Sequence, residues 1–174
     1  MEYTRRNFLR TLGKSLAGIA IASTIPTIAE AKQGRIYMPK FARVRLDQSI
    51  IPGGSFSWGE ATKNGQRVPN NSEIVNSIVK SARYMQGVRE YFGNRPIRVN
   101  SWYRDANSNK SVGGSPTSRH LRGDAVDFIV DGISPEEVYR QLEAYHGNHG
   151  GLGKYSQKGF THLDLRGKRA RWIG

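Results

Sequence analysis

The sequence contains no cysteine, few acidic residues and no apolar run long enough to cross a membrane. Without cysteine, disulfide-stapled scaffolds and thiolate metal sites are excluded. Asp and Glu number 14 against 27 Lys and Arg, so the formal charge is +13 and an anionic partner is expected. No segment recurs at a fixed period, which excludes a repeat array. Because 37% of the 174 residues are hydrophobic, the chain can still build the core of one domain.

The first 31 residues are typical of a processing segment rather than of a folded domain. A pair of arginines, Arg5 and Arg6, precedes a moderately apolar stretch at 16–28, and the segment closes on the small-x-small triplet 29–31. This order resembles a bacterial twin-arginine export signal that is cleaved after Ala31. An uncleaved membrane anchor is the alternative, but the stretch is shorter than the ~20 apolar residues that a spanning helix needs.

Cleavage at this point would leave the basic excess in the mature chain. The segment carries four basic and two acidic side chains, so its removal lowers the formal charge from +13 to +11. Because the twin-arginine machinery carries folded proteins, the resemblance implies a domain in the periplasm or at the surface of a bacterium, with no stable membrane span after cleavage. Nucleic acid is then not expected as the partner, whereas cell-wall polymer and acidic lipid remain open.

The mature chain divides into a short N-terminal part and one larger domain. Residues 32–54 combine a polar linker with an alternating segment at 41–46 that suits a half-exposed strand, and residues 55–174 form the domain. Apolar periodicity and capping residues predict one helix from near Ser72 to a glycine cap at Gly93, and a second from Ser134 to about Tyr145. Strands are predicted at 96–101, 125–130, 150–155 and 160–165, and loops at 50–69 and 105–118. This irregular order favours an α+β domain with a small, mostly antiparallel sheet and flanking helices.

Two of the four histidines stand near aspartates at spacings that can bring them into one site. His120 precedes Asp127 by seven residues, and Gly123 between them can turn the chain so that both side chains reach one face. On the last predicted strand, His162 and Asp164 share a face. Two imidazoles and one carboxylate are the ligand set of a catalytic zinc site. A surface histidine and a strand aspartate with a charged partner is the alternative, because burial of an unpaired carboxylate is costly.

Several motifs together resemble a known family. The run Ser-x-His-x-x-Gly-x-Ala-x-Asp at 118–127, with a later His-x-Asp at 162–164, is similar to the zinc-dependent D-alanyl-D-alanine peptidases, which share a fold with the hedgehog signalling domain. Further similar segments lie at 98–104, 112–118, 151–155 and 166–172. The resemblance implies a hedgehog/D,D-peptidase-like fold, a Zn²⁺ cofactor and peptides of the cell wall as substrate.

The resemblance also implies roles for particular residues. It assigns the metal to His120, Asp127 and His162. Arg104 would lie in the substrate pocket and hold a substrate carboxylate or a developing oxyanion, unless it forms a salt bridge with Asp105 or Asp124 instead. Ser118 would bind substrate, or serve as a plain loop residue.

The general base is the point at which the chain departs from the family. Better-known members carry an acidic residue or a histidine three residues before the last ligand, where this chain has Gly159. Asp164, on the same face as His162, is the candidate catalytic base, or else a residue that orients a ligand.

The function that these features imply is an exported zinc metallopeptidase acting on peptidoglycan stem peptides or cross-links, as a D,D-carboxypeptidase or an endopeptidase. A catalytically silent, metal-containing wall-binding module is the alternative, which the glycine at 159 favours.

Four other residues and the tail allow two interpretations. His146 and His149 flank a glycine-rich turn and are expected outside the site. Trp102 and Tyr103 suit either a substrate groove or the core. The basic tail at 166–172 suits either a murein-binding surface or a solvated strand edge.

Overall fold

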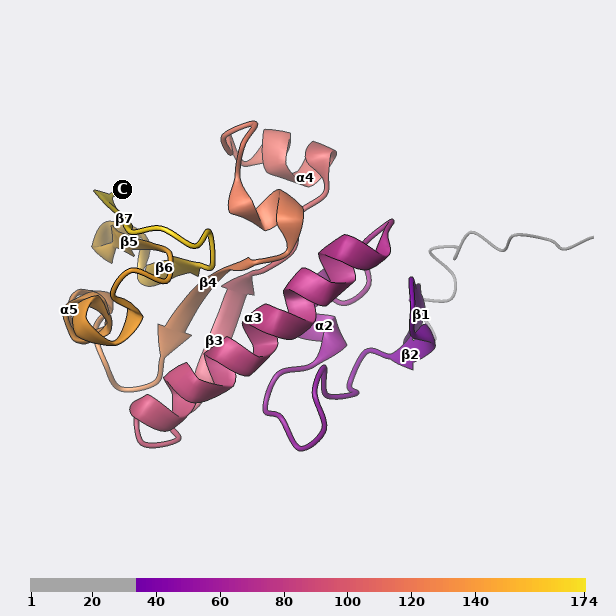
Figure 1. Ribbon diagram of the computed structural model, residues 1–174, viewed down its shortest axis with the longest axis horizontal. Helices are drawn as coiled ribbons and strands as arrows, with labels where there is room; N and C mark the ends of the chain where they lie inside the picture. The colour runs from indigo at the N-terminus through magenta and orange to yellow at the C-terminus, as the bar shows by residue number, and fades with distance from the viewer. Residues whose placement is uncertain (1–33) are drawn as a thin grey trace, which may run out of the picture.

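The computed structural model describes residues 34–174 (Figure 1), so the predicted export segment, 1–31, lies outside the described residues. Two antiparallel strands, β1 (Arg35–Met38) and β2 (Ala42–Arg45), form a small sheet of their own. The other strands form a five-stranded sheet. Between residues 34 and 174, no helix has the length and hydropathy required to cross a bilayer.

The five-stranded sheet has the order β3-β4-β6-β5-β7. Its strands are β3 (Ile97–Ser101), β4 (Ala125–Val130), β5 (Gly151–Tyr155), β6 (Phe160–Asp164) and β7 (Ala170–Ile173). Neighbouring strands are antiparallel except β5 and β7, which are parallel. The predicted α+β class with a mostly antiparallel sheet is confirmed.

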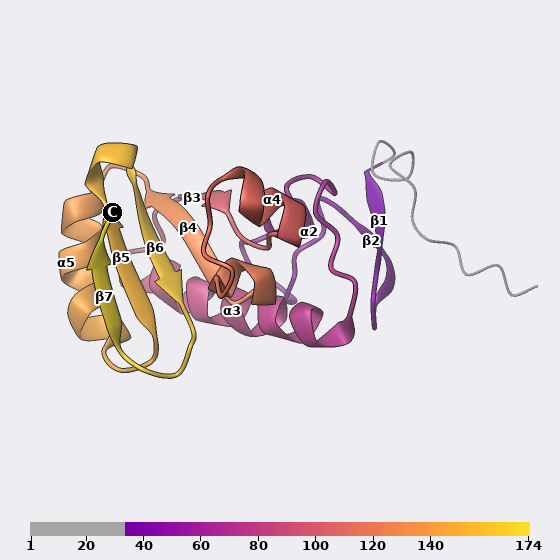
Figure 2. The same ribbon diagram turned by 90° about the horizontal axis from the view of Figure 1, so that it is seen from above.

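Two long helices flank this sheet, α3 (Ser72–Tyr91) and α5 (Pro135–His146). Helix α5 contacts β4, β5 and β6, and α3 runs beside β3 and β4 in both ribbon views (Figures 1 and 2). The shorter helices are α2 (Trp58–Thr62), α4 (Ala106–Ser111) and the 3-10 turns η1 (Arg119–Arg122) and η2 (Ser156–Lys158).

Local capping explains where the long helices begin and end. The Asn71 side chain accepts a hydrogen bond from the Ile74 N–H at 3.0 Å, and Gly93 follows the helix with φ +66°. At α5, Ser134 accepts from the Glu137 N–H at 3.2 Å, with proline at the start of the helix. Both predicted helices are confirmed within about one residue.

Three elements differ from the sequence-based expectation. The predicted linker contains β1, and the predicted loops at 50–69 and 105–118 contain α2 and α4, so the loop predictions are wrong there. Helix α2 is only five residues long and is closed by a capping box of Ser57 and Glu60. Helix α4 is rich in Asn and Ser, which are weak helix formers, and Asp105 caps it by accepting from Ser108 N–H at 2.7 Å. Strand β7 lies at the edge of the five-stranded sheet, as the strand-edge interpretation of the basic tail expects.

Alternation along β4 and β6 separates the core from the opposite face. Val126, Phe128 and Leu163 are at most 1% exposed and belong to the core cluster. Asp127 lies between Val126 and Phe128 on β4, and its cross-strand partner His162 precedes Leu163 on β6. Both side chains line the pocket on the opposite face, as alternation along a strand requires. The sheet therefore presents polar side chains on one face and supports them with apolar packing on the other.

A bulge in β3 sets the position of Ser101. Val99 pairs with Phe128, but Ser101 pairs with Asp127, so Asn100 is an extra residue in β3. Without that extra residue, Ser101 would oppose Val126. The bulge therefore brings the Ser101 side chain next to Asp127.

Gly123 makes the turn between His120 and Asp127, as the sequence predicts. Its φ is +75°, and a Cβ there would lie 2.7 Å from Ile78 Cγ1 and 3.0 Å from Ile74 O on α3. Both the backbone conformation and the close approach of α3 therefore require glycine.

We expect Gly123→Ala to lower the free energy of unfolding by about 3 kcal/mol, since a left-handed backbone penalty of about 1–2 kcal/mol adds to an overpacking cost of similar size. Gly159→Ala is the matched control, because Gly159 has the same φ of +75° but no atom within 4 Å of a built Cβ. Its loss should be about 1 kcal/mol. Urea unfolding of both variants measures the difference, and equal losses would contradict a packing constraint at Gly123.

Candidate metal centre and substrate pocket

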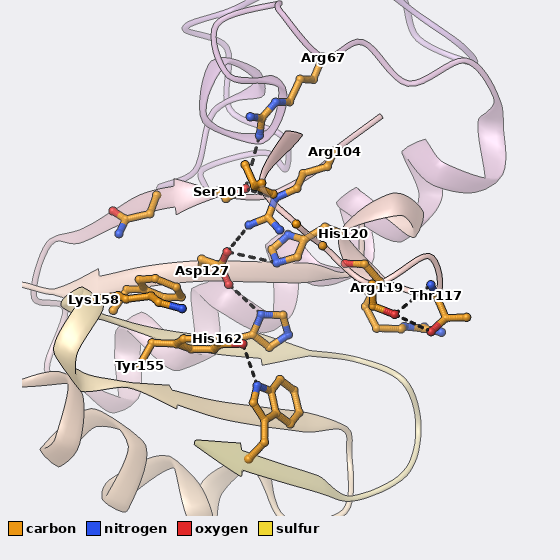
Figure 3. Close-up of a pocket in the computed structure, with 18 of the residues that line it drawn as sticks. Arg67, Ser101, Arg104, Thr117, Arg119, His120, Asp127, Tyr155, Lys158 and His162 are labelled. Atoms are coloured by element: carbon orange, nitrogen blue, oxygen red, sulfur yellow. Dashed lines mark hydrogen bonds and ion pairs between the residues drawn. The ribbon is translucent and has the colours of Figure 1, made fainter. Parts of the chain in front are cut away.

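A pocket of about 840 Å³ lies over the polar face of the sheet (Figure 3). Strands β4 and β6 supply Asp127 and His162, and η1 supplies His120. The remaining lining comes from the segments at 63–67, 100–104 and 112–119, and from residues of the β5–β7 side. The three predicted metal ligands therefore meet at one pocket, although they come from three separate elements.

The three side chains can hold one metal ion. Their nearest ligand atoms all lie within 4.8 Å of one another. His120 Nε2 is 3.2 Å from Asp127 Oδ2, and His162 Nδ1 is 2.7 Å from Asp127 Oδ1. Asp127 and His162 are direct cross-strand partners in the β4–β6 ladder, which fixes their separation. Two imidazole nitrogens and one carboxylate oxygen suit a four-coordinate metal with one position left for water.

The second nitrogen of each imidazole has its own partner. His120 Nδ1 is 2.6 Å from the backbone oxygen of Trp102, and His162 Nε2 is 3.2 Å from Asp164 Oδ2. These contacts fix which nitrogen of each ring faces Asp127, in the manner typical of metal-binding histidines. His120 and His162 are 3% and 7% exposed, so the alternative of a surface histidine is excluded.

The electrostatics of the cluster favour the metal-binding protonation state at Asp127 and His120, but not at His162. Burial works to raise the pKa of Asp127, but hydrogen bonds from His120 and His162 outweigh it and hold the pKa well below the usual range. Burial lowers the pKa of His120, which keeps that ring neutral. For His162, burial works in the same direction, but hydrogen bonds to Asp127 and Asp164 raise its pKa overall. A metal ion would compete with the proton on that ring.

Asp164 is enclosed by partners rather than open to the pocket. It is 0% exposed, accepts from Arg166 Nε at 2.8 Å and Nη2 at 2.5 Å, and also accepts from Gly151 N at 3.1 Å. Against the effect of burial, hydrogen bonds from His162 and Arg166 lower its pKa. A carboxylate so occupied is poorly placed to take a proton from water. The contacts therefore favour the orienting role of Asp164 over the role of catalytic base.

Arg104 and Ser118 both line the pocket. Arg104 Nη2 lies 2.5 Å from Asp127 Oδ2, and its Nε donates to Ser101 Oγ at 2.8 Å. The alternative salt bridge of Arg104 with Asp105 or Asp124 is wrong, because Asp105 caps α4 and Asp124 pairs with Arg119. Ser118 precedes η1, and its side chain caps no N–H of that turn.

Four residues with two sequence interpretations lie outside this pocket. Trp102 and Tyr103 are 1% and 5% exposed and belong to the core, so neither lines the groove. His146 is fully buried and bonds to Tyr84 Oη at 2.8 Å and to Asp164 O at 3.1 Å, and burial lowers its pKa to about 4. His149 lines a separate cavity.

Other pocket residues were given no role by the sequence motifs. They are Arg67, Arg119, Tyr155, Lys158 and Trp172. Trp172 lies in the tail, where the sequence resemblance extends to its segment without assigning a role, and its Nε1 donates to Tyr155 Oη at 2.9 Å. Arg67 stands in a segment whose sequence carries no recognisable pattern.

The chain belongs to the peptidase M15 family, whose model matches residues 56–164. The zinc D-Ala-D-Ala carboxypeptidase of Streptomyces albus G is 34% identical over 79 residues, which are 42% of this chain and 31% of that protein. The peptidoglycan L,D-endopeptidase MepK of Escherichia coli strain K12 is 30% identical over 83 residues, 45% of this chain and 44% of that protein. A probable peptidoglycan L,D-endopeptidase MepK of Haemophilus influenzae is 33% identical over 86 residues, which are 47% of this chain and 45% of that protein. The matches span less than half the length of these relatives.

The two candidate roles of Asp164 predict different effects of its replacement on Zn²⁺ affinity and on turnover. If Asp164 orients His162, Asp164→Asn should weaken Zn²⁺ binding roughly 10–100-fold, and saturating Zn²⁺ should restore turnover. If it is the base, Zn²⁺ affinity should stay unchanged while turnover is lost. Zn²⁺ titration alongside peptide hydrolysis separates these outcomes. The matched control is Asp47→Asn, an exposed carboxylate paired with Arg45, which should change neither quantity.

Proposed function

We propose that this chain is an exported zinc metallopeptidase that hydrolyses peptide bonds in peptidoglycan stem peptides or cross-links. The observation that carries the proposal is the meeting of His120, Asp127 and His162 at one pocket, inside the segment that matches the peptidase M15 family. The relatives named for activities on D-Ala-D-Ala and on peptidoglycan support the choice of substrate class.

In this proposal, His120 Nε2, an Asp127 oxygen and His162 Nδ1 hold the zinc ion. Held there, the ion would supply a water whose pKa is lowered towards ~7 and would polarise the scissile carbonyl. Arg104, whose guanidinium lies against the Asp127 carboxylate, stabilises negative charge that develops on the substrate oxygen. Ser118, which lines the pocket just before η1, offers a hydroxyl to the peptide. Asp164 holds the His162 ring in place.

A specific observation keeps the silent wall-binding module as a second candidate. Among the described residues that line the pocket, Asp127 is the only carboxylate, and it belongs to the ligand cluster. The position three residues before His162 is Gly159, which offers no side chain. Binding without hydrolysis would therefore be the outcome if no other group accepts the proton of the attacking water.

Mass spectrometry of purified muropeptides after incubation with the Zn²⁺-loaded protein tests the proposal. We expect loss of D-alanine or of a cross-link, abolished by chelator and by His120→Ala, because each removes the metal. His149→Ala is the matched control and should remain active, since His149 lies at a different cavity. Stoichiometric Zn²⁺ binding without any cleavage would instead support the silent module.

Export has its own test. Expressed in a bacterium with twin-arginine machinery, the chain should appear outside the cytoplasm with Lys32 as its first residue, as N-terminal sequencing would show. Replacing both Arg5 and Arg6 with lysine should retain the protein in the cytoplasm, because the paired arginines are the expected recognition element. Arg10→Lys should still be exported. A full-length, membrane-attached product would contradict cleavage after Ala31.

A further inference from the structure

Arg67 is a largely buried cation that forms no ion pair with any carboxylate in the described part of the chain. It is 9% exposed and lies between α2 and α3, where its backbone N–H donates to Thr62 O at 2.9 Å. Its guanidinium makes one long hydrogen bond, from Nη1 to Ser101 Oγ at 3.4 Å. Within residues 34–174, no carboxylate forms an ion pair with it. Keeping a charged group mostly out of water is costly unless an anion binds to it.

The free nitrogens of Arg67 open into the pocket. In the described part of the chain, Asn109 Oδ1 alone is a fully buried polar side-chain atom without a partner. The Nε and Nη2 atoms of Arg67, which have no hydrogen bond, therefore retain exposed surface. Arg67 lines the same pocket as the metal-ligand cluster, so this exposed surface opens into that pocket (Figure 3).

A second guanidinium lies beside it. Arg104 Nε donates to the same Ser101 Oγ at 2.8 Å, so the two arginines meet at one hydroxyl. Arg104 is already paired with Asp127, whereas Arg67 is not. Burial and then the positive charge of Arg104 lower the pKa of Arg67, and the negative charge of Asp105 offsets this only in part, so the two cations disfavour each other. An anion bound at Arg67 would relieve both costs.

The distance of Arg67 from the metal-ligand cluster determines which part of a bound peptide could supply that anion. Ser101 is the cross-strand partner of Asp127, and paired strands lie ~5 Å apart. Arg67 lies beyond Ser101, about one or two residues of extended peptide from the cluster, at ~3.5 Å per residue. If the scissile bond of a peptide lies at the cluster, the group that reaches Arg67 is about one residue further along the peptide.

We propose that Arg67 binds the C-terminal carboxylate of the peptide substrate, so that the enzyme removes a terminal residue rather than cutting within a chain. This inference rests on the proposed function, since it takes the metal-ligand cluster as the cleavage site. The planar guanidinium presents two N–H groups in the spacing of a carboxylate, which a single bidentate contact satisfies. Arg67 is thus a specificity-determining residue, distinct from Arg104 beside the cluster.

Kinetics on a matched pair of peptides test the proposal. The two substrates are one peptide ending in D-alanyl-D-alanine as the free acid and the same peptide amidated at its C-terminus. We expect the Zn²⁺-loaded protein to prefer the acid, and Arg67→Gln to lower kcat/KM for the acid roughly 10–100-fold, mainly through KM. The same variant should leave the amide within about twofold. Arg67→Lys should recover part of the loss, because it keeps the charge but not the fork.

Lys63→Gln is the control for general electrostatics. Lys63 lines the same end of the pocket but is exposed, so its replacement should leave the preference for the acid intact. Equal losses on acid and amide in Arg67→Gln would indicate a structural role and overturn the inference, as would a wild-type protein that cleaves both peptides equally.

Binding without catalysis separates this inference from the proposed function. Calorimetric titration of each peptide into chelator-treated protein should show tighter binding of the acid, and Arg67→Gln should remove that difference. If neither peptide is hydrolysed by the Zn²⁺-loaded protein but this difference is present, the proposed function fails and Arg67 still stands as the carboxylate site. If hydrolysis occurs but acid and amide bind alike, the inference on Arg67 fails alone.

Discussion

The pairing of β4 with β6 is the interaction on which the site depends. Because Asp127 and His162 are cross-strand partners, ladder hydrogen bonds and the packing of Val126 and Leu163 beneath them determine their separation. A shift of β6 by one residue along β4 would turn His162 towards the core while Asp127 kept its place, and the pair would be lost. The carboxylate and the imidazole are thus held by the most buried part of the sheet, and only His120 depends on a turn outside it.

Basic side chains in the pocket account for part of the positive charge of the whole chain. Among residues 34–174, six Lys and Arg side chains line this pocket, against a single carboxylate. Two of these cations, on Arg119 and Arg166, are neutralised by Asp124 and Asp164. The remaining excess makes the pocket attractive to anionic peptides before any specific contact forms. The anionic partner that the composition predicts is therefore consistent with the positive charge of the pocket.

Much of the fold and site could be predicted because the signals were local. Alternation of apolar and polar residues identified β4 and β6, and capping residues identified α3 and α5. The spacing of two residues predicted that His162 and Asp164 share a face, and their side chains are hydrogen-bonded at 3.2 Å. The short helices α2 and α4 were missed because their few residues carry little propensity and they are held by side-chain caps. Arg67 could not be predicted, since its proximity to Ser101 arises from contacts between segments 34 residues apart and a bulge that no periodicity reveals.

The extra residue in β3 has a consequence for how such a pocket can diverge. Asn100 determines how far the Ser101 end of the pocket stands from Asp127, yet it contributes nothing to the pairing of β4 with β6. Adding or removing a residue in this stretch would change the spacing between the cationic end of the pocket and the metal-ligand cluster while leaving the cluster itself unaltered. Insertions and deletions in one edge strand, rather than substitutions in the cluster, are therefore a physically economical way for related chains to accept peptides of different length.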